Sequence, residues 1–192
     1  MYALILSTAV IFVAELGDKS QLMAMTFATR YRTRDVLIGI TAATALVHLA
    51  SVVIGHYVGA AFASRQWIVS IVAGVAFLVF AAWTLRGDEL TDAEADKAQM
   101  SQGAALLAVG SAFFLAELGD KTMLATITLA ADHNWLGVWI GSTVGMVAAD
   151  ALAIVLGAVL GKKLPERLIK IVASLAFLVF GIILIIEGIT SR

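Results

Sequence analysis

Two copies of one charged motif hold most of the residues of this sequence that could do chemistry. Ala14–Ser20 reads AELGDKS, and Ala116–Thr122 reads AELGDKT. Each copy lies about fourteen residues into a long segment that is otherwise uncharged. Carboxylate and hydroxyl oxygens are ligands for hard cations such as Mn2+, Ca2+ and Mg2+, and the lack of Cys and His in both motifs argues against zinc or copper. The motifs therefore predict a divalent cation site.

The acids of the two motifs are the candidate metal ligands. On a continuous helix, Glu15 and Asp18 stand three residues apart on one face, and Glu117 and Asp120 do the same. The four carboxylates could then converge, and further oxygens would come from the hydroxyls of Ser20 and Thr122.

A glycine lies between the two acids of each motif. Gly17 and Gly119 have no side chain, so we expect close helix approach or local unwinding at both positions.

Each motif also contains a lysine. Lys19 and Lys121 could balance the negative charge or act as internal counter-ions that replace the metal. Four acids and two lysines sum to −2, which one divalent cation or two protons would neutralise. Alternatively, Glu15–Lys19 and Glu117–Lys121 are buried ion pairs at i and i+4 that fix helix register. This alternative leaves the two aspartates unpaired and gives no reason for the set to occur twice.

The composition indicates a membrane protein. Of the 192 residues, 61% are hydrophobic and only 14% are charged, and the mean hydropathy is +0.97; a soluble domain is nearer one quarter charged. The net charge of −1 without a basic stripe argues against nucleic-acid binding. The absence of cysteine excludes disulfides and thiolate metal sites.

Six segments are long and apolar enough to cross a bilayer, which takes about 20 residues. The first, second, fourth and fifth are longer than a straight span requires, which indicates tilt, a break or a re-entrant piece. Because the one proline, Pro165, falls in a loop, we expect any break to come from glycine or from helix packing. The segments are residues 2–29, 36–63, 66–85, 103–131, 135–161 and 168–189.

The chain is an internal duplication with an offset of 102 residues between the motifs. Gly39, Gly55 and Gly59 recur as Gly141, Gly157 and Gly161. Three spans per half make the second half enter the membrane in the opposite sense, with the substrate site near the midplane between the halves. We therefore predict an all-α integral membrane fold of six transmembrane helices in two inverted three-helix repeats, residues 1–85 and 103–192, joined by an acidic linker, residues 86–102.

The distribution of basic residues predicts the orientation. Nine Lys and Arg fall in or beside the loops after odd-numbered spans and two on the opposite side, which places both termini outside the cytoplasm and the linker inside. The linker is either a solvated connector or an acidic patch that gathers cations.

Asp150 is a further acid within the fifth span, at the position where the first half has His48. It is either a relay or auxiliary ligand, or a group that faces a water-filled crevice.

The duplicated motif on two three-span halves resembles the small manganese and calcium transporter family, which includes Golgi manganese transporters and bacterial manganese exporters. The resemblance covers essentially the whole chain. It implies a secondary cation/proton exchanger of the cytoplasmic membrane that moves Mn2+ outward. It also implies that Glu15, Asp18, Glu117 and Asp120 are the acidic ligands, with Lys19, Lys121, Ser20 and Thr122 completing the motifs.

We therefore expect a transporter rather than an enzyme, with no cofactor and with Mn2+, or also Ca2+, as substrate exchanged for protons. No ATP-binding motif is present, so a gradient must drive it. Three alternatives stay open. They are a Ca2+/H+ exchanger, an exporter of small cationic organic solutes, and a membrane scaffold whose buried charges only lock helices together.

Overall fold

The computed structural model describes residues 1–86, 105–160 and 166–192. Every regular element in these ranges is helical. Most of the predicted acidic linker, as well as Gly161 and Pro165, lies outside the described residues.

Four helices are long and apolar enough to cross a membrane. They are α3 (Thr33–Ala61), α4 (Gln66–Arg86), α8 (Trp135–Leu160) and α9 (Glu166–Thr190), and a short 3-10 turn, η1 (Ala63–Arg65), precedes α4. These helices correspond to the second, third, fifth and sixth predicted spans. The second and fifth, although longer than a straight span needs, are continuous helices of 29 and 26 residues.

The first and fourth predicted spans are each broken into two helices. The first consists of α1 (Tyr2–Glu15) and α2 (Lys19–Ala28), and the fourth of α6 (Ala105–Glu117) and α7 (Lys121–Asp132). Gly17 and Gly119 have φ angles of 76° and 79°, a left-handed conformation that is costly for residues with a Cβ. Of the two expected causes of a break, glycine and helix packing, a left-handed glycine is present at both breaks.

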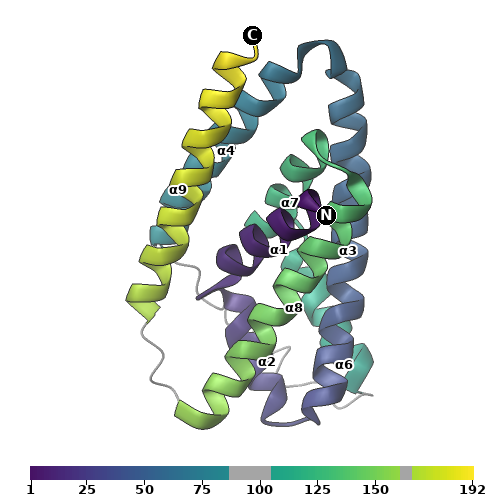
Figure 1. Cartoon of the computed structure of the whole chain (residues 1–192). Helices are drawn as coiled ribbons and strands as arrows, with labels where there is room; N and C mark the ends of the chain where they lie inside the picture. The colour runs from purple at the N-terminus through teal and green to yellow at the C-terminus, as the bar shows by residue number, and fades with distance from the viewer. Residues whose placement is uncertain (87–104, 161–165) are drawn as a thin grey trace.

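The two halves are packed into each other (Figure 1). Helix α1 packs along α8 and α6 along α3, while α2 contacts α8 and α7 contacts α3. Close approach depends on glycine: a Cβ on Gly141 would lie 2.4 Å from the Leu4 carbonyl oxygen, and one on Gly39 would lie 2.9 Å from the Val109 Cβ. Helices α4 and α9 pack mainly against each other, side by side in Figure 1, while α9 also contacts α1 and α4 also contacts α7.

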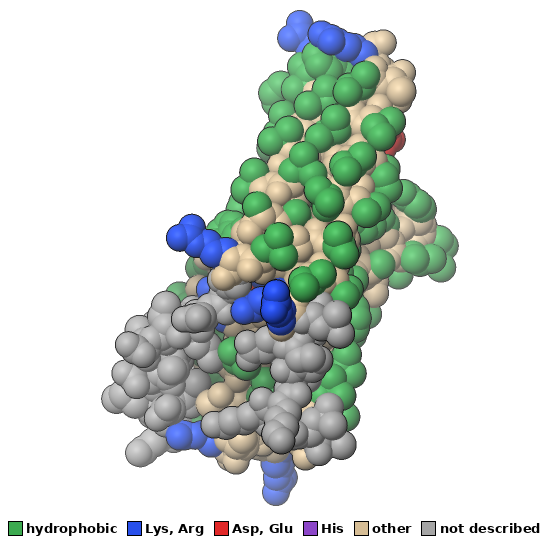
Figure 2. Space-filling view, turned by 90° about the vertical axis from the view of Figure 1, so that its left-hand side faces the viewer, with side chains coloured by type: hydrophobic (Ala, Val, Ile, Leu, Met, Phe, Trp, Pro, Cys, Tyr) green, Lys and Arg blue, Asp and Glu red, His purple; other side chains and the backbone are tan. Residues whose placement is uncertain are grey.

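The surface of this pair is strongly apolar. Figure 2 shows hydrophobic side chains over most of the α4–α9 side, with Lys and Arg side chains gathered toward its two ends. Exposed residues on α9 include Val179, Ile183 and Ile186, which are 52–56% exposed. An apolar band between basic ends is the surface expected of helices that face lipid.

Candidate cation site between two helix breaks

Each motif lies at the break of its own helix pair. Glu15 is the last residue of α1 and Asp18 is the residue before the first turn of α2. Glu117 ends α6 and Asp120 precedes α7 in the same way. The expectation that the two acids of a motif share one helical face is therefore wrong, because the left-handed glycine changes the chain direction between them.

Five of the six charged groups of the motifs are buried, Lys19 being the partly exposed one. Glu15 and Glu117 are completely inaccessible, and Asp18, Asp120 and Lys121 are at most 6% exposed. Ionisable side chains at such positions cost several kcal/mol, roughly 2.5 to 3.5 each on insertion scales. Such a cost indicates that these groups serve a function.

The two glutamates have equivalent local partners. The Ser20 hydroxyl donates a hydrogen bond to Oε1 of Glu15, and the Thr122 hydroxyl donates one to Oε2 of Glu117 at 2.9 Å. The second oxygen of each glutamate, Oε2 of Glu15 and Oε1 of Glu117, has no hydrogen-bond partner among the described residues. Each half therefore presents one buried carboxylate oxygen that can accept a proton or a cation.

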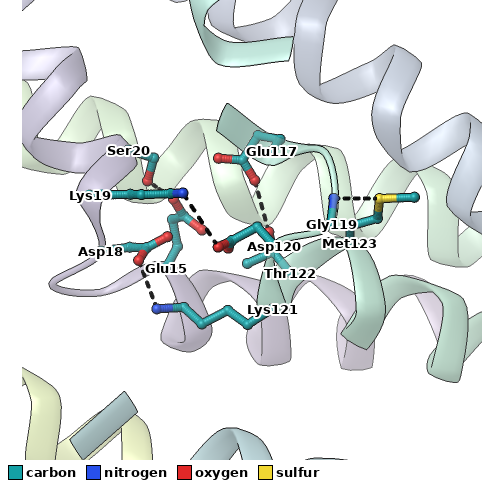
Figure 3. A network of polar contacts seen from close by, with 10 residues as sticks. All are labelled: Glu15, Asp18, Lys19, Ser20, Glu117, Gly119, Asp120, Lys121, Thr122 and Met123. Carbon is teal, nitrogen blue, oxygen red and sulfur yellow. Dashed lines mark hydrogen bonds and ion pairs between the residues drawn. The ribbon is translucent and has the colours of Figure 1, made fainter. Parts of the chain in front are cut away.

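The lysines form ion pairs across the two motifs (Figure 3). Lys121 Nζ lies 2.8 Å from Asp18 Oδ1, and Lys19 Nζ lies 3.9 Å from Asp120 Oδ1. Because Glu15 and Lys19 belong to different helices, as do Glu117 and Lys121, the helical i, i+4 geometry expected for register-fixing pairs does not apply. The pairs join the two repeats, and so they link the positions of the two breaks.

The two cross pairs are unequal. The Lys121 side chain is 3% exposed, whereas that of Lys19 is 19% exposed. A short pair in a dry environment interacts more strongly than a long pair reached by water. The Asp18 half of the site is therefore held more tightly by its lysine than the Asp120 half.

The carboxylates of the described residues are not arranged as a complete metal-coordination site. Within the part of the chain that the structure describes, no three His, Asp or Glu side chains are grouped so that they could hold a metal ion. Binding one cation between the motifs would require the carboxylates to approach one another and the lysine ammonium groups to move away.

Asp150 lies in α8 beside this cluster. It is completely buried, and neither carboxylate oxygen has a hydrogen-bond partner among the described residues. It is close enough to Asp18, Glu15 and Glu117 to interact with them electrostatically. His48, at the equivalent position of α3, is also completely buried, and neither of its ring nitrogens is bonded within the same residues.

Gln21 is a residue of the site that our sequence analysis missed. Its Oε1 accepts a hydrogen bond from the Gly17 N–H at 2.8 Å, and its Nε2 donates one to the Ala149 carbonyl at 3.0 Å. An amide directly after a charged motif, in an otherwise apolar segment, was the signal that could have identified it.

The family model for the divalent cation/proton antiporter GDT1 matches residues 3–92 and 105–192 of this chain. The chain belongs to the GDT1 family. The matched ranges contain both motifs, Gln21 and Asp150. The resemblance noted from the motifs is therefore confirmed, and the GDT1 family consists of transporters rather than enzymes.

Several known proteins are similar to this chain over most of its length. A Vibrio cholerae protein named "Putative manganese exporter" is 36% identical over 69% of this chain and 64% of its own length. The GDT1-like protein sll0615 of Synechocystis is 29% identical, covering 90% of this chain and 91% of its own. GDT1-like protein 5 of Arabidopsis thaliana is 30% identical, covering 92% of each. No solved structure matches the chain.

Membership of the GDT1 family agrees with the composition and helices of the chain, which is a multi-pass membrane protein. A divalent cation and protons are the species that a GDT1-family antiporter exchanges, so the metal is cargo.

Proposed function

We propose that the protein exports Mn2+ in exchange for protons, with the metal bound between the two helix breaks by Glu15, Asp18, Glu117 and Asp120 and by the hydroxyls of Ser20 and Thr122. The observation that carries this proposal is the cluster of buried acids at the two breaks, in which each glutamate has one oxygen with no hydrogen-bond partner among the described residues. An all-oxygen set of this kind suits Mn2+, Ca2+ and Mg2+. The Vibrio relative with manganese exporter in its name favours Mn2+ as the first candidate.

Lysine movement accompanies metal binding in this proposal. Lys121 and Lys19 face the aspartates that the metal would use. A divalent cation that binds these aspartates displaces the ammonium groups by electrostatic competition, since like charges repel strongly in a low-dielectric site. The lysines thus act as internal counter-ions that the cargo replaces.

Proton coupling follows from the number of buried acids. Acids held together in a dry site cannot all stay ionised without a cation, so metal and protons compete for the same oxygens. Asp150, with both oxygens unpartnered among the described residues, is the candidate group for taking up a proton beside the metal site. An exchange of one divalent cation for two protons would move no net charge.

The proposed architecture is six spans in two inverted repeats, residues 1–85 and 103–192, in which the two broken helices are the first and fourth spans. Equivalent contacts in the two halves support it. Gly55 packs against Ile127 and Gly157 against Met25, pairs that exchange when 102 residues are added or subtracted. The Thr44 hydroxyl contacts Met146 Sδ at 3.3 Å, and these two positions are themselves equivalent, as expected next to a pseudo-two-fold axis.

We place the protein in the cell membrane with both termini outside the cytoplasm, on the strength of the nine-to-two bias in basic residues. With this orientation the loop between α2 and α3 and the linker of residues 86–102 face the cytoplasm. Export then means that the site opens first toward the side of the linker.

Flux into proteoliposomes tests the proposed cargo. Purified protein is reconstituted, and uptake of Mn2+, Ca2+ and Mg2+ is measured under the same imposed pH gradient. We expect Mn2+ uptake well above that of protein-free vesicles. Uptake of Ca2+ alone would favour the Ca2+/H+ exchanger, and no metal uptake with retained folding would favour a scaffold of buried ion pairs.

A further inference from the structure

The two helix breaks are capped by different side chains. In the first break the Gly17 N–H donates to the amide oxygen of Gln21, and in the second the Gly119 N–H donates to Met123 Sδ at 3.2 Å. Gln21 and Met123 are equivalent residues, 102 positions apart. The same backbone break therefore has an amide cap in one repeat and a thioether cap in the other.

Only the amide can also donate a hydrogen bond. Gln21 uses its Nε2 to reach the Ala149 carbonyl on α8, whereas a thioether sulfur is only a weak acceptor. Gln21 is 5% exposed and its bond to the Ala149 carbonyl is buried, so breaking that bond leaves a costly unpaired group. The first break is therefore attached to α8 by a bond that Met123 has no group to reproduce on α3.

The bond ends next to Asp150. Ala149 is the residue before Asp150, and Asp150 interacts electrostatically with Asp18 of the first motif. Gln21 thus connects the turn that holds Glu15 and Asp18 to the turn of α8 that holds the additional acid.

We propose that Gln21 is a positioning residue that holds the first motif in register with Asp150, so that the two half-sites are unequal and the first is the fixed half. The inference rests on the proposed transport function, since register matters only if these acids share a cation or a proton. It assigns the larger movement during exchange to the second break, at Gly119.

The transport test replaces Gln21 by the residue that its own repeat partner carries. Gln21→Met keeps an acceptor for the Gly17 N–H and removes the donor to Ala149. We expect the KM for Mn2+ to rise about five- to tenfold, the loss of one buried hydrogen bond, with the maximal rate within about twofold of the parent. The matched control, Met123→Leu, removes only a weak sulfur acceptor, so we expect both values to stay within about twofold of the parent.

A distance measurement tests the same bond without transport. The chain has no cysteine, so Thr29→Cys and Ala158→Cys introduce the only two spin-label sites, one at the end of α2 and one on α8. We expect one narrow distance distribution in the otherwise unchanged protein and in Met123→Leu, and a broadened or shifted one in Gln21→Met. Gln21→Asn has a shorter side chain whose amide cannot reach both the Gly17 N–H and the Ala149 carbonyl, so it should behave like Gln21→Met. It serves as the test variant if the Gln21→Met protein does not accumulate.

The outcomes separate the two proposals. An unchanged KM in Gln21→Met, or an unchanged distance distribution in both Gln21 variants, would overturn the positioning role. A loss of thermal stability that tracks the KM change and is equal in Met123→Leu would also overturn it, since this is the signature of a purely structural residue. Absence of Mn2+ flux in the parent together with the predicted distance changes would instead refute the transport proposal and leave the α2–α8 connection standing.

Discussion

Asp18 and Asp120 each face the lysine of the opposite motif, at 2.8 and 3.9 Å. In the exchange that we propose, these are the carboxylates whose partners change when a cation enters. The residue types and their duplication were sufficient to predict the set of acids. The crossing of the lysines could not be predicted, because it depends on the direction that the chain takes after each glycine.

The aspartates can be tested by removing charge at constant size. We expect Asp18→Asn or Asp120→Asn to lower Mn2+ transport by at least tenfold while membrane abundance is unchanged, since loss of a membrane charge does not impair insertion. Vesicle flux and immunoblotting measure the two quantities. Asp132→Asn, at the end of α7 and outside the cluster, is the control. Parental transport by either motif variant would refute the shared carboxylate site.

The lysines can be tested through thermal stability. Lys121→Gln leaves the buried Asp18 without its close cation, so we expect a lower melting temperature in metal-free buffer, by the equivalent of a few kcal/mol. Mn2+ then supplies the missing positive charge, so the rise in melting temperature on adding Mn2+ should be larger for Lys121→Gln than for the parent. Lys19→Gln, which removes a longer and more exposed pair, should show a smaller change. Equal shifts in the parent and in Lys121→Gln would show that metal and lysine do not compete.

Helices α1 and α6 end at the motifs and α2 and α7 begin there, so the breaks are the elements that bring the acids together. Segment length predicted tilt, a break or a re-entrant piece in the first, second, fourth and fifth spans, and the absence of proline from them left glycine or helix packing as the cause of any break. The same length signal occurs in the second and fifth, which are continuous. Length alone could not separate these cases, because the break depends on the left-handed conformation at Gly17 and Gly119.

The left-handed backbone conformation at the second break can be tested by substituting Gly119. A Cβ on Gly119 would meet no atom of the described residues within 4 Å, so Gly119→Ala tests backbone conformation without steric overlap. The left-handed conformation costs a residue with a Cβ roughly 1–2 kcal/mol, and we expect Mn2+ transport to fall several-fold. Gly119→Asn should retain more activity, because asparagine tolerates this conformation better. Equal activity in both variants would show that the backbone at this break is not limiting.

At the scale of the whole molecule, helices of each half pack against helices of the other half. Helix α1 packs against α8, and α6 packs against α3. Duplication and the odd number of spans predicted an inverted arrangement, and the equivalent glycine contacts support it. Which helix of one half packs on which helix of the other could not be predicted, because that choice depends on complementary surfaces such as Gly141 against the Leu4 carbonyl.

Orientation is the prediction that belongs to this scale. A reporter fused after Arg192 should be active only outside the cytoplasm, and one inserted between α2 and α3, at Arg32, only inside. The opposite pattern would reverse the direction of transport that we propose.

The most direct test of the central claim is whether a pH gradient drives Mn2+ through the protein. In proteoliposomes with the membrane voltage clamped at zero, Mn2+ should accumulate on the more acidic side while protons appear on the opposite side, from which the Mn2+ is taken up, because metal and protons compete for the same buried carboxylates. A proton ionophore should abolish the accumulation. Mn2+ flux that is unchanged when the ionophore collapses the gradient would contradict exchange and indicate a channel or uniporter.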